Sequence, residues 1–428
     1  MAEGGVTVVD SQRAAAYAVR QGLTQPRGRE SLCEIVGRLC GLQDQVAGGA
    51  YYAARARSEA VEPGDLQTEL QETRRLVRTW TIRGTMHVIR TVDLPLFRAA
   101  LLPDWETRWS VFLDHYATRD QRRTAAEAAL EVLRDGPATR AELLERVGRT
   151  LGGAPPWLAA LFSGYGGVLK DLSYQGLIIH GPTGDGPGRS GEVSFVRTED
   201  WLGSGSPASP PADADAALSV LLTRYLQAYG PASVQDFAYW SGVTVARTRR
   251  ALELAGDQVG PADPGLRAGS IGPGSLLDIR PPGGPGGLGG PDGAAGKGGP
   301  GGQAGSDGAA GKGGLAESGS DDHCPPGPAA PVAFLPKFDS YVLAHRDKFY
   351  LEEPYRREVF RAAADVAATV VADGVVVGTW RWQGTGSSRS VAASLFGTPS
   401  PELIRLVDEE GSRLGLAGAP VPARPSRT

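Results

Sequence analysis

Apolar residues recur along the first 90 residues with two different periods. Residues 11–24, 30–42 and 65–75 show the three-to-four-residue spacing of amphipathic helices. Residues 77–89 instead alternate in the manner of strands, with an interruption at Gly84 that predicts a β-hairpin turning there. Three helices followed by a hairpin are the order of elements in a winged helix.

The same order of elements recurs twice. Residues 119–135, 139–151 and 157–176 are expected to be helices, and short strands are expected at 177–180 and 193–197. A third run of helices is expected at 214–229, 233–241 and 244–255. The three runs share an order of elements and no sequence period, so the chain predicts tandem units in an α+β fold.

The C-terminal part has a different pattern. ATVVADGVVVGTWRW predicts a second hairpin about Asp373-Gly374, a strand is expected within 390–397, and 400–414 reads as a capped helix. Between 281 and 320, 18 of 40 residues are glycine and DGAAGKGG occurs twice, which indicates a disordered insertion. Its GKG is not a phosphate-binding loop, because the glycine five residues earlier and the following Ser or Thr are absent.

These patterns divide the chain into five segments. The expected boundaries are a first unit at 10–118, a second at 119–205, a third at 213–280, a Gly/Pro-rich insertion at 281–330 and a small β-rich domain at 331–415.

Composition narrows the classes of function. The 428 residues carry a net charge of −4 with a pI near 5.9, which excludes a strongly basic coat but leaves room for a local basic groove. Three cysteines exclude a disulfide scaffold, and Cys33 and Cys40 are expected to be small core residues. Neither a signal peptide nor a membrane span is expected, so the protein is predicted to be cytoplasmic.

Catalytic motifs of the common hydrolases are absent. The sequence contains no GxSxG and no HExxH, and its five histidines are scattered, so neither a metal nor a cofactor is expected. Gln43-Asp44-Gln45 is one candidate, because two amides spaced by two residues can point the same way and hold a water molecule. The alternative is a polar surface turn with solvated side chains.

The first hairpin is the other candidate. Trp80, Arg83 and His87 flank its tip, where they could contact phosphates or wedge into a DNA groove. The alternative is an ordinary wing with Trp80 in the core. Further candidate phosphate contacts are Arg247, Arg249 and Arg250 on the helix 244–255, together with Lys337. A solvated helix face, or ion pairs with nearby aspartates, is the alternative for these basic residues.

Several segments resemble one family. LCGLQDQVAGG followed by LVRTWTIRGTMHVIRTVDLP is similar to the bacterial tandem winged-helix DNA glycosylases, the AlkZ/YcaQ-like proteins. GPASVQDFAYWSGV, FLPKFDSYVLAHRDKF and VVADGVVVGTWRW resemble later parts of the same family, so the resemblance covers about residues 10–280 and 331–385. It implies three tandem winged-helix units around a concave DNA-binding face.

The resemblance also implies a chemistry. The Gln-x-Gln motif of the family falls on Gln43 and Gln45, whereas the middle position, usually apolar, is Asp44 here. Asp44 could point away, cap a neighbouring helix or contribute a carboxylate. The implied activity is a monofunctional DNA glycosylase for bulky N7-alkylguanine adducts or interstrand crosslinks, in repair or in resistance to a self-made alkylating agent.

Two other functions remain open at this point. A winged helix is most often a binding module, so a non-catalytic DNA-binding protein or transcriptional regulator is the principal alternative. An interaction protein has only the glycine-rich insertion in its favour. The expected partner is double-stranded DNA with an alkylated guanine, with no membrane partner and a monomeric chain.

Overall fold

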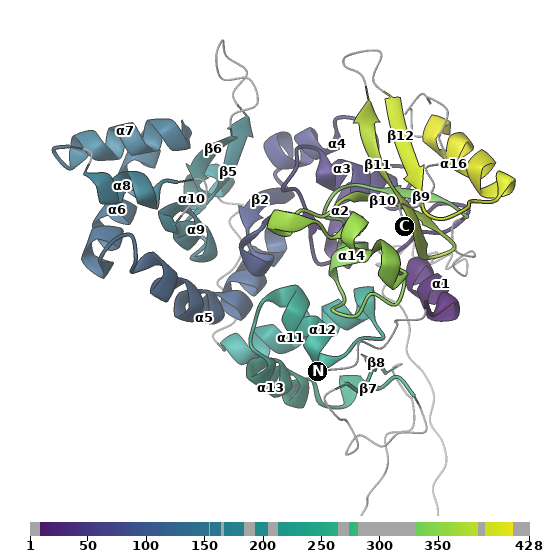
Figure 1. Ribbon diagram of the computed structural model, residues 1–428. Coiled ribbons are helices and arrows are strands. Elements are labelled where there is room, and N and C mark those ends of the chain that lie inside the picture. Colours follow the sequence, from purple (N-terminus) through teal and green to yellow (C-terminus); the bar gives the residue numbers. More distant parts are fainter. Residues whose placement is uncertain are drawn as a thin grey trace, which may run out of the picture.

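The structure is a computed structural model. It describes residues 9–153, 155–163, 167–183, 193–203, 213–263, 274–280, 331–383 and 390–413. The predicted insertion at 281–330 and Cys324 lie outside these residues. Helices and sheets are mixed along the chain, as the predicted α+β class requires. In Figure 1, α6 to α9 form a lobe at the left, the C-terminal strands lie at the right, and α11 to α13 lie below them.

The first unit begins with α1 (Ser11–Arg20), α2 (Leu32–Arg38) and α3 (Gly49–Arg55). A capping box between Ser31 and Glu34 starts α2. The prediction that this helix runs to residue 42 is wrong, because Cys40 adopts a left-handed φ of 53° that ends the helix. Leu42–Gln43 then pairs as a short strand, β1.

The short α4 (Asp65–Gln67) and a following turn of π-helix lead into the predicted hairpin, which consists of β2 (Leu76–Trp80) and β3 (Met86–Arg90). Its turn lies at Ile82–Gly84, so the prediction at Gly84 is confirmed. The long α5 (Leu94–Leu113) follows and joins the first unit to the second. α5 is not among the helices predicted from the sequence, and it contains Pro103 although proline usually ends a helix.

The second unit contains α6 (Arg119–Val132), α7 (Arg140–Thr150), α8 (Pro156–Leu161) and α9 (Gly167–Tyr174). The helix expected at 157–176 is therefore two helices. The strands β5 (Ile178–Thr183) and β6 (Val193–Arg197) lie at the expected positions, whereas the short β4 (Ala138–Thr139) was not expected. The helix α10 (Thr198–Leu202) ends the unit.

Strands of the first two units belong to one sheet. The order is β1-β3-β2-β5-β6-β4, and a pairing of Arg78 with His180 joins the two halves. The motif Gln43-Asp44-Gln45 therefore lies at one edge of a six-stranded sheet, which continues through both hairpins. A boundary near residue 118 stays a prediction, because the sheet crosses it.

The third unit has the three predicted helices, α11 (Ala214–Tyr229), α12 (Val234–Ser241) and α13 (Val245–Ala255). They are followed by a two-stranded ladder of β7 (Val259–Pro261) and β8 (Leu277–Ile279). Capping boxes or single caps at Asp213, Ser233 and Thr244 start these helices, which is why the sequence located them closely.

The C-terminal part is an antiparallel sheet in the order β12-β11-β10-β9. The strands are β9 (Ala333–Leu335), β10 (Ala368–Ala372), β11 (Val375–Gln383) and β12 (Ser390–Leu395). The helices of this part are α14 (Ser340–Leu343), α15 (Arg356–Val359) and α16 (Pro401–Arg413). Asp373 and Gly374 have positive φ values of 47° and 85°, so the predicted hairpin turn is confirmed.

A buried ion pair joins this sheet to the first unit. Arg57 donates to both carboxylate oxygens of Asp339, at 2.8 and 3.0 Å, and both side chains are fully buried. Arg57 follows α3, and Asp339 caps the start of α14. The pair therefore holds the C-terminal sheet beside the segment that carries the Gln-x-Gln motif.

Candidate active site

The Gln-x-Gln motif lies where a strand turns into a helix. Gln43 pairs with His87 across β1 and β3, and the Asp44 amide donates to the Met86 carbonyl at 2.9 Å. The chain then turns at Gly48, whose φ of 78° favours glycine, and enters α3. The motif is thus held by backbone hydrogen bonds on one side and by a helix on the other.

The two glutamines have complementary environments. Gln43 is 8% exposed, and its buried Oε1 accepts no hydrogen bond from the described residues. Gln45 is exposed, and its Oε1 accepts from the Met86 amide at 3.1 Å. Gln43 therefore offers an acceptor, whereas Gln45 keeps its NH₂ group to donate. A buried acceptor without a partner costs free energy unless water or a ligand satisfies it.

Asp44 is engaged by the protein itself. Its Oδ2 lies 2.5 Å from Nη2 of Arg78 on β2, and its Oδ1 accepts from the Ala50 amide at 3.0 Å, in the first turn of α3. Of the alternatives that the sequence left open, capping of the neighbouring helix is the one the structure shows. The carboxylate fixes the turn of the motif against the sheet.

A large groove borders the motif. Its volume is about 1,760 Å³, and it lies between residues 46–67 on one side and the C-terminal sheet on the other. Val46, the residue after the motif, and Arg78, the partner of Asp44, both line it. The exposed Arg381 on β11 is another lining residue.

Aromatic side chains from distant segments meet in this groove. The ring centroids of Tyr52 on α3 and Trp382 on β11 are 5.6 Å apart. Lys337, a predicted DNA contact, also lines the groove, where its Nζ forms an ion pair with Asp365 at 2.5 Å. Sequence reasoning missed Arg78, Tyr52, Arg381 and Trp382. The signal that could have identified the last two is the WRW run at the end of the second hairpin.

His87 cannot act as an acid near neutral pH. It is buried, and this burial lowers its pKa to about 3. Its Nδ1 lies 3.0 Å from the Thr85 carbonyl oxygen, so this nitrogen is the donor. The imidazole beside Gln43 is therefore neutral. It stabilises the hairpin by donating a hydrogen bond to the hairpin backbone at Thr85.

The hairpin tip is packed inside the protein. The Gly84 amide donates to the Tyr174 hydroxyl at 2.8 Å, and a Cβ at Gly84 would lie only 3.2 Å from the Trp105 ring. Trp80 is 5% exposed and stacks on Phe195 with ring centroids 5.6 Å apart. α5 and α9 cover the tip at Gly84, and DNA contact by the more accessible Arg83 stays a prediction. Trp80 is a core residue.

Arg83 is the tip residue with an open side. It is half-buried, and its Nη1 lies 3.5 Å from the carbonyl oxygen of Tyr239 on α12. No ion pair is recorded for it among the described residues.

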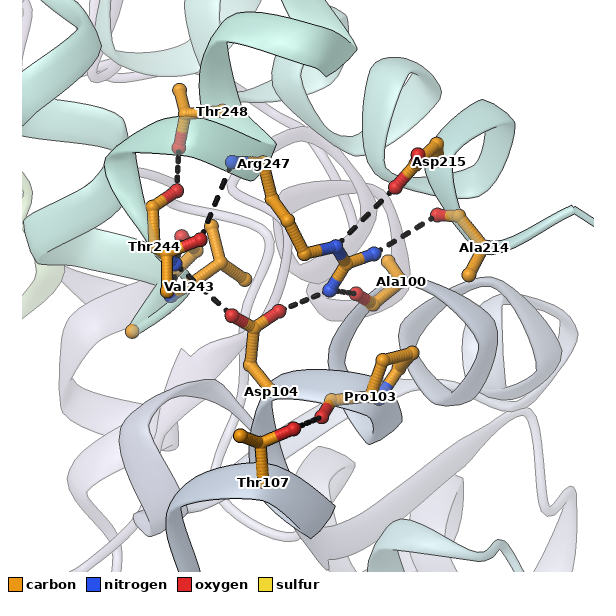
Figure 2. Close-up of polar contacts among 12 residues, drawn as sticks. Ala100, Pro103, Asp104, Thr107, Ala214, Asp215, Val243, Thr244, Arg247 and Thr248 are labelled. Carbon is orange, nitrogen blue, oxygen red and sulfur yellow. Dashed lines mark hydrogen bonds and ion pairs between the residues drawn. The ribbon is translucent and has the colours of Figure 1, made fainter.

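Arg247 joins the third unit to α5. Figure 2 shows its guanidinium within contact of the Asp104 carboxylate, the Asp215 carboxylate and the carbonyl oxygens of Ala100 and Ala214. The guanidinium of Arg247 donates to oxygen atoms of the protein itself, so it is not free to make the predicted phosphate contact. On the same helix, Arg250 pairs with Glu253 at 2.9 Å, whereas Arg249 is exposed and has no ion-pair partner among the described residues.

Two kinds of feature are absent from the part of the chain that the structure describes. No three His, Cys, Asp or Glu side chains gather there in a way that could hold a metal ion. None of the helices in this part of the chain is long and apolar enough to cross a membrane.

A sequence model of the family described as "DNA glycosylase AlkZ-like" matches residues 36–285 and 307–416. The chain belongs to this family, and it is a DNA glycosylase, acting on N-glycosyl bonds of DNA.

Two similarities extend along nearly the whole chain. An "Interstrand DNA cross-link repair glycosylase" of Streptomyces sahachiroi is 25% identical over 421 residues, which cover 94% of this chain and 95% of that protein. The solved structure of the "Streptomyces sahachiroi DNA glycosylase AlkZ" superposes with a TM-score of 0.69 at 23% identity, covering 97% of this chain and 99% of that one. At this identity the structural likeness shows the fold.

Proposed function

We propose that Gln43 and Gln45 hold the water molecule that hydrolyses the N-glycosidic bond of an N7-alkylated guanine. The observation that carries the proposal is the buried Gln43 Oε1, which has no donor among the described residues. A water molecule can donate to this oxygen and accept from the Gln45 NH₂ group, whose own oxygen is occupied by the Met86 amide. The water is then oriented by both amides.

Hydrolysis of a cationic nucleotide needs no strong acid or base, so two neutral amides can support it. The C1′–N9 bond breaks and its electron pair neutralises the positive charge of the alkylated base, so the leaving group needs no proton. The water oxygen forms the new bond to C1′, and its proton is released to solvent. Orientation of the water supplies the main catalytic advantage. An amide is a weaker base than a carboxylate, and it assists only when the base leaves readily.

The neutral His87 supports selectivity for cationic lesions. With a pKa lowered to about 3 by burial, this imidazole has no proton to give to a leaving base at neutral pH. Asp44 is held by Arg78 and by the start of α3. The motif therefore offers no acid for a neutral damaged base, and such bases are expected to be poor substrates.

The groove beside the motif supports a bulky lesion as substrate. Its volume of about 1,760 Å³ exceeds what a single flipped base needs. The relative from Streptomyces sahachiroi is named for interstrand cross-link repair. We infer that this chain likewise acts on crosslinks or bulky N7-guanine adducts in double-stranded DNA, working as a monomer in DNA repair or in resistance to an alkylating product.

Base release is the direct test. Purified full-length protein is incubated with a duplex carrying N7-methylguanine, a bulky N7-adduct or an N7-linked crosslink, and the free base and abasic strand are quantified. Wild type should release the base, whereas Gln43→Ala and Gln45→Ala should each lower the rate constant at least about a hundredfold, or about 2.7 kcal/mol. The matched control is Gln258→Ala, an exposed glutamine outside the site.

The contrary outcomes are distinct. Release that survives in both glutamine variants would overturn the assignment of the motif. Tight binding of every duplex without release by the wild type would favour the non-catalytic DNA-binding alternative. Equal release of a neutral damaged base would contradict the role given to the amides.

A further inference from the structure

Three large aromatic side chains are exposed within the described part of the chain, and all three lie in one region. Phe112, Tyr116 and Tyr239 are 39%, 45% and 38% exposed. The Phe112 and Tyr116 rings are 5.2 Å apart at the end of α5, and Phe112 and Tyr239 line the same hollow. Exposed aromatic rings of this kind are costly in water and usually mark a binding surface.

The hollow has a volume of about 570 Å³ and lies between α5, the end of α12 and the tip of the first hairpin. It is separate from the groove beside the Gln-x-Gln motif, with which it shares no lining residue. A continuous stack of rings forms one wall. Tyr174 and Trp105 are 4.0 Å apart, and Trp105 and Trp109 are 4.6 Å apart, both nearly parallel.

The charge at the hollow is positive. Arg83 and Arg108 line it, and no ion pair is recorded for either one in the described chain. Asp104 is the one acidic residue in the lining that the structure describes, and Arg247 already pairs with it. The hollow therefore presents two unneutralised guanidinium groups beside flat aromatic surfaces. This combination matches a nucleobase with its phosphates, because rings stack on bases and guanidinium groups bind phosphate oxygens.

The backbone at the tip points to the same function. Arg83 has a left-handed conformation with φ 55° and ψ 21°, which is unusual for a residue other than glycine. The packing around the tip holds it there, and strained residues of this kind concentrate at binding sites. Arg83 precedes His87, the strand partner of Gln43, by four residues, a segment that could reach at most about 14 Å if it were fully extended. The hollow and the motif therefore belong to the same hairpin, one at its tip and the other beside its second strand.

We propose that this hollow is a second DNA subsite, which takes an unpaired nucleobase against Phe112 and Tyr239 and binds the adjacent phosphates through Arg83 and Arg108. It would hold a base near the lesion after the duplex has opened there. The proposal uses the DNA substrate of the family and does not depend on the role proposed for Gln43 and Gln45.

The test compares two undamaged, fluorescently labelled duplexes of equal length. One is fully paired and the other has a central bubble of unpaired thymines, and binding of the full-length protein is followed by fluorescence anisotropy. Wild type should prefer the bubble. The double variant Phe112→Ala/Tyr239→Ala should weaken binding of the bubble by about tenfold and binding of the paired duplex by less than about twofold. Arg108→Gln should weaken both and reduce the dependence on salt.

Matched variants separate stacking from a loss of structure. Phe112→Tyr and Tyr239→Phe keep the aromatic rings and should keep the preference for the bubble duplex. Val220→Ala removes an exposed apolar side chain on α11, away from the hollow, and should also leave this preference unchanged. Quenching of tryptophan fluorescence by the bubble duplex should be lost in the alanine double variant. Unchanged bubble binding in that variant, or an equal loss for both duplexes, would overturn the proposal.

The inference and the proposed function fail in different ways. Gln43→Ala/Gln45→Ala should abolish base release while the preference for the bubble stays intact. If wild type releases no base but retains an aromatic-dependent preference, the catalytic proposal fails and the second subsite stands. If the Phe112→Ala/Tyr239→Ala variant keeps both the preference for the bubble and normal base release, the subsite proposal fails and the catalytic proposal stands.

Discussion

Arg78 and Asp44 connect the sheet to the Gln-x-Gln motif. The Nη2 atom of Arg78, on β2, lies 2.5 Å from Oδ2 of Asp44, and the Asp44 side chain is almost fully buried. The second carboxylate oxygen accepts from the Ala50 amide at the start of α3. Asp44 therefore fixes the turn of the motif between β2 and α3. This contact also fixes the positions of Gln43 and Gln45, the residues on either side of Asp44.

Asp44→Asn should destabilise the protein and misplace the motif. The amide can still accept from Ala50, but it leaves the charge of Arg78 without its partner in a partly buried place. Loss of one partner from such a pair is expected to lower the free energy of unfolding by about 2–4 kcal/mol. Urea unfolding measures this change.

Base-release kinetics distinguish a positioning role of Asp44 from a catalytic one. A positioning role predicts that the turnover rate falls without a new ionisation in its pH profile. Disappearance of an acidic limb in Asp44→Asn, with stability unchanged, would instead make the carboxylate a general base.

Asp339→Asn should be among the most destabilising single changes. It leaves Arg57, which is fully buried, with an unneutralised charge between the first unit and the C-terminal sheet. The expected loss is about 3–5 kcal/mol. The matched control is Glu59→Gln, which breaks an exposed ion pair with Arg413 and should cost less than about 1 kcal/mol. Similar thermal midpoints for the two variants would contradict this ranking.

Arg247→Gln and Arg249→Gln should separate structure from DNA binding on one helix. Arg247 contacts Asp104 and Asp215, so its loss should lower stability and leave the salt dependence of DNA binding unchanged. Arg249 is exposed, and it forms no ion pair within the part of the chain that the structure describes. If it binds phosphate, its removal should reduce the slope of log affinity against log salt by about 1, with normal stability. Anisotropy titrations at several salt concentrations measure both slopes, and the reverse pattern would refute the assignment.

Asp171 should make the protein less stable as the pH rises from about 4 to about 6. Burial raises its pKa to about 6, so within this window the folded state keeps a proton that the unfolded state has lost. Stability from this group is complete below about pH 4 and declines until the folded state also deprotonates. The Trp105 Nε1–H group donates to Oδ1 of Asp171 at 2.7 Å. Asp171→Asn keeps an acceptor for this group and removes the charge.

The Asp171→Asn variant should therefore gain about 1–2 kcal/mol above pH 6 relative to wild type and nothing near pH 4. Denaturant unfolding at pH 4, 5, 6 and 7 measures the difference, and Asp120→Asn serves as an exposed control on α6. A constant difference across these pH values would mean that the carboxyl group titrates normally.

Much of the fold follows from short segments of sequence. Capping residues such as Ser31 and Ser233, the alternation within β2 and β3, and the Asp373-Gly374 turn each involve neighbours in the chain. Local hydrogen bonds and side-chain periodicity act over a few residues, and for this reason they can be recognised without a structure. The family motif at Gln43 and Gln45 could be recognised for the same reason.

Other features depended on segments far apart in the chain. Arg247 meets Asp104 across 143 residues, Arg57 meets Asp339 across 282, and the hairpin tip is covered by α5 and α9. The sequence alone indicated many of the helices, both hairpins and the paired glutamines, since local geometry encodes them, but it did not indicate α3 or α5. Only the tertiary structure decided which arginines remain available for DNA, because a charge is free or neutralised according to what the folded chain packs against it.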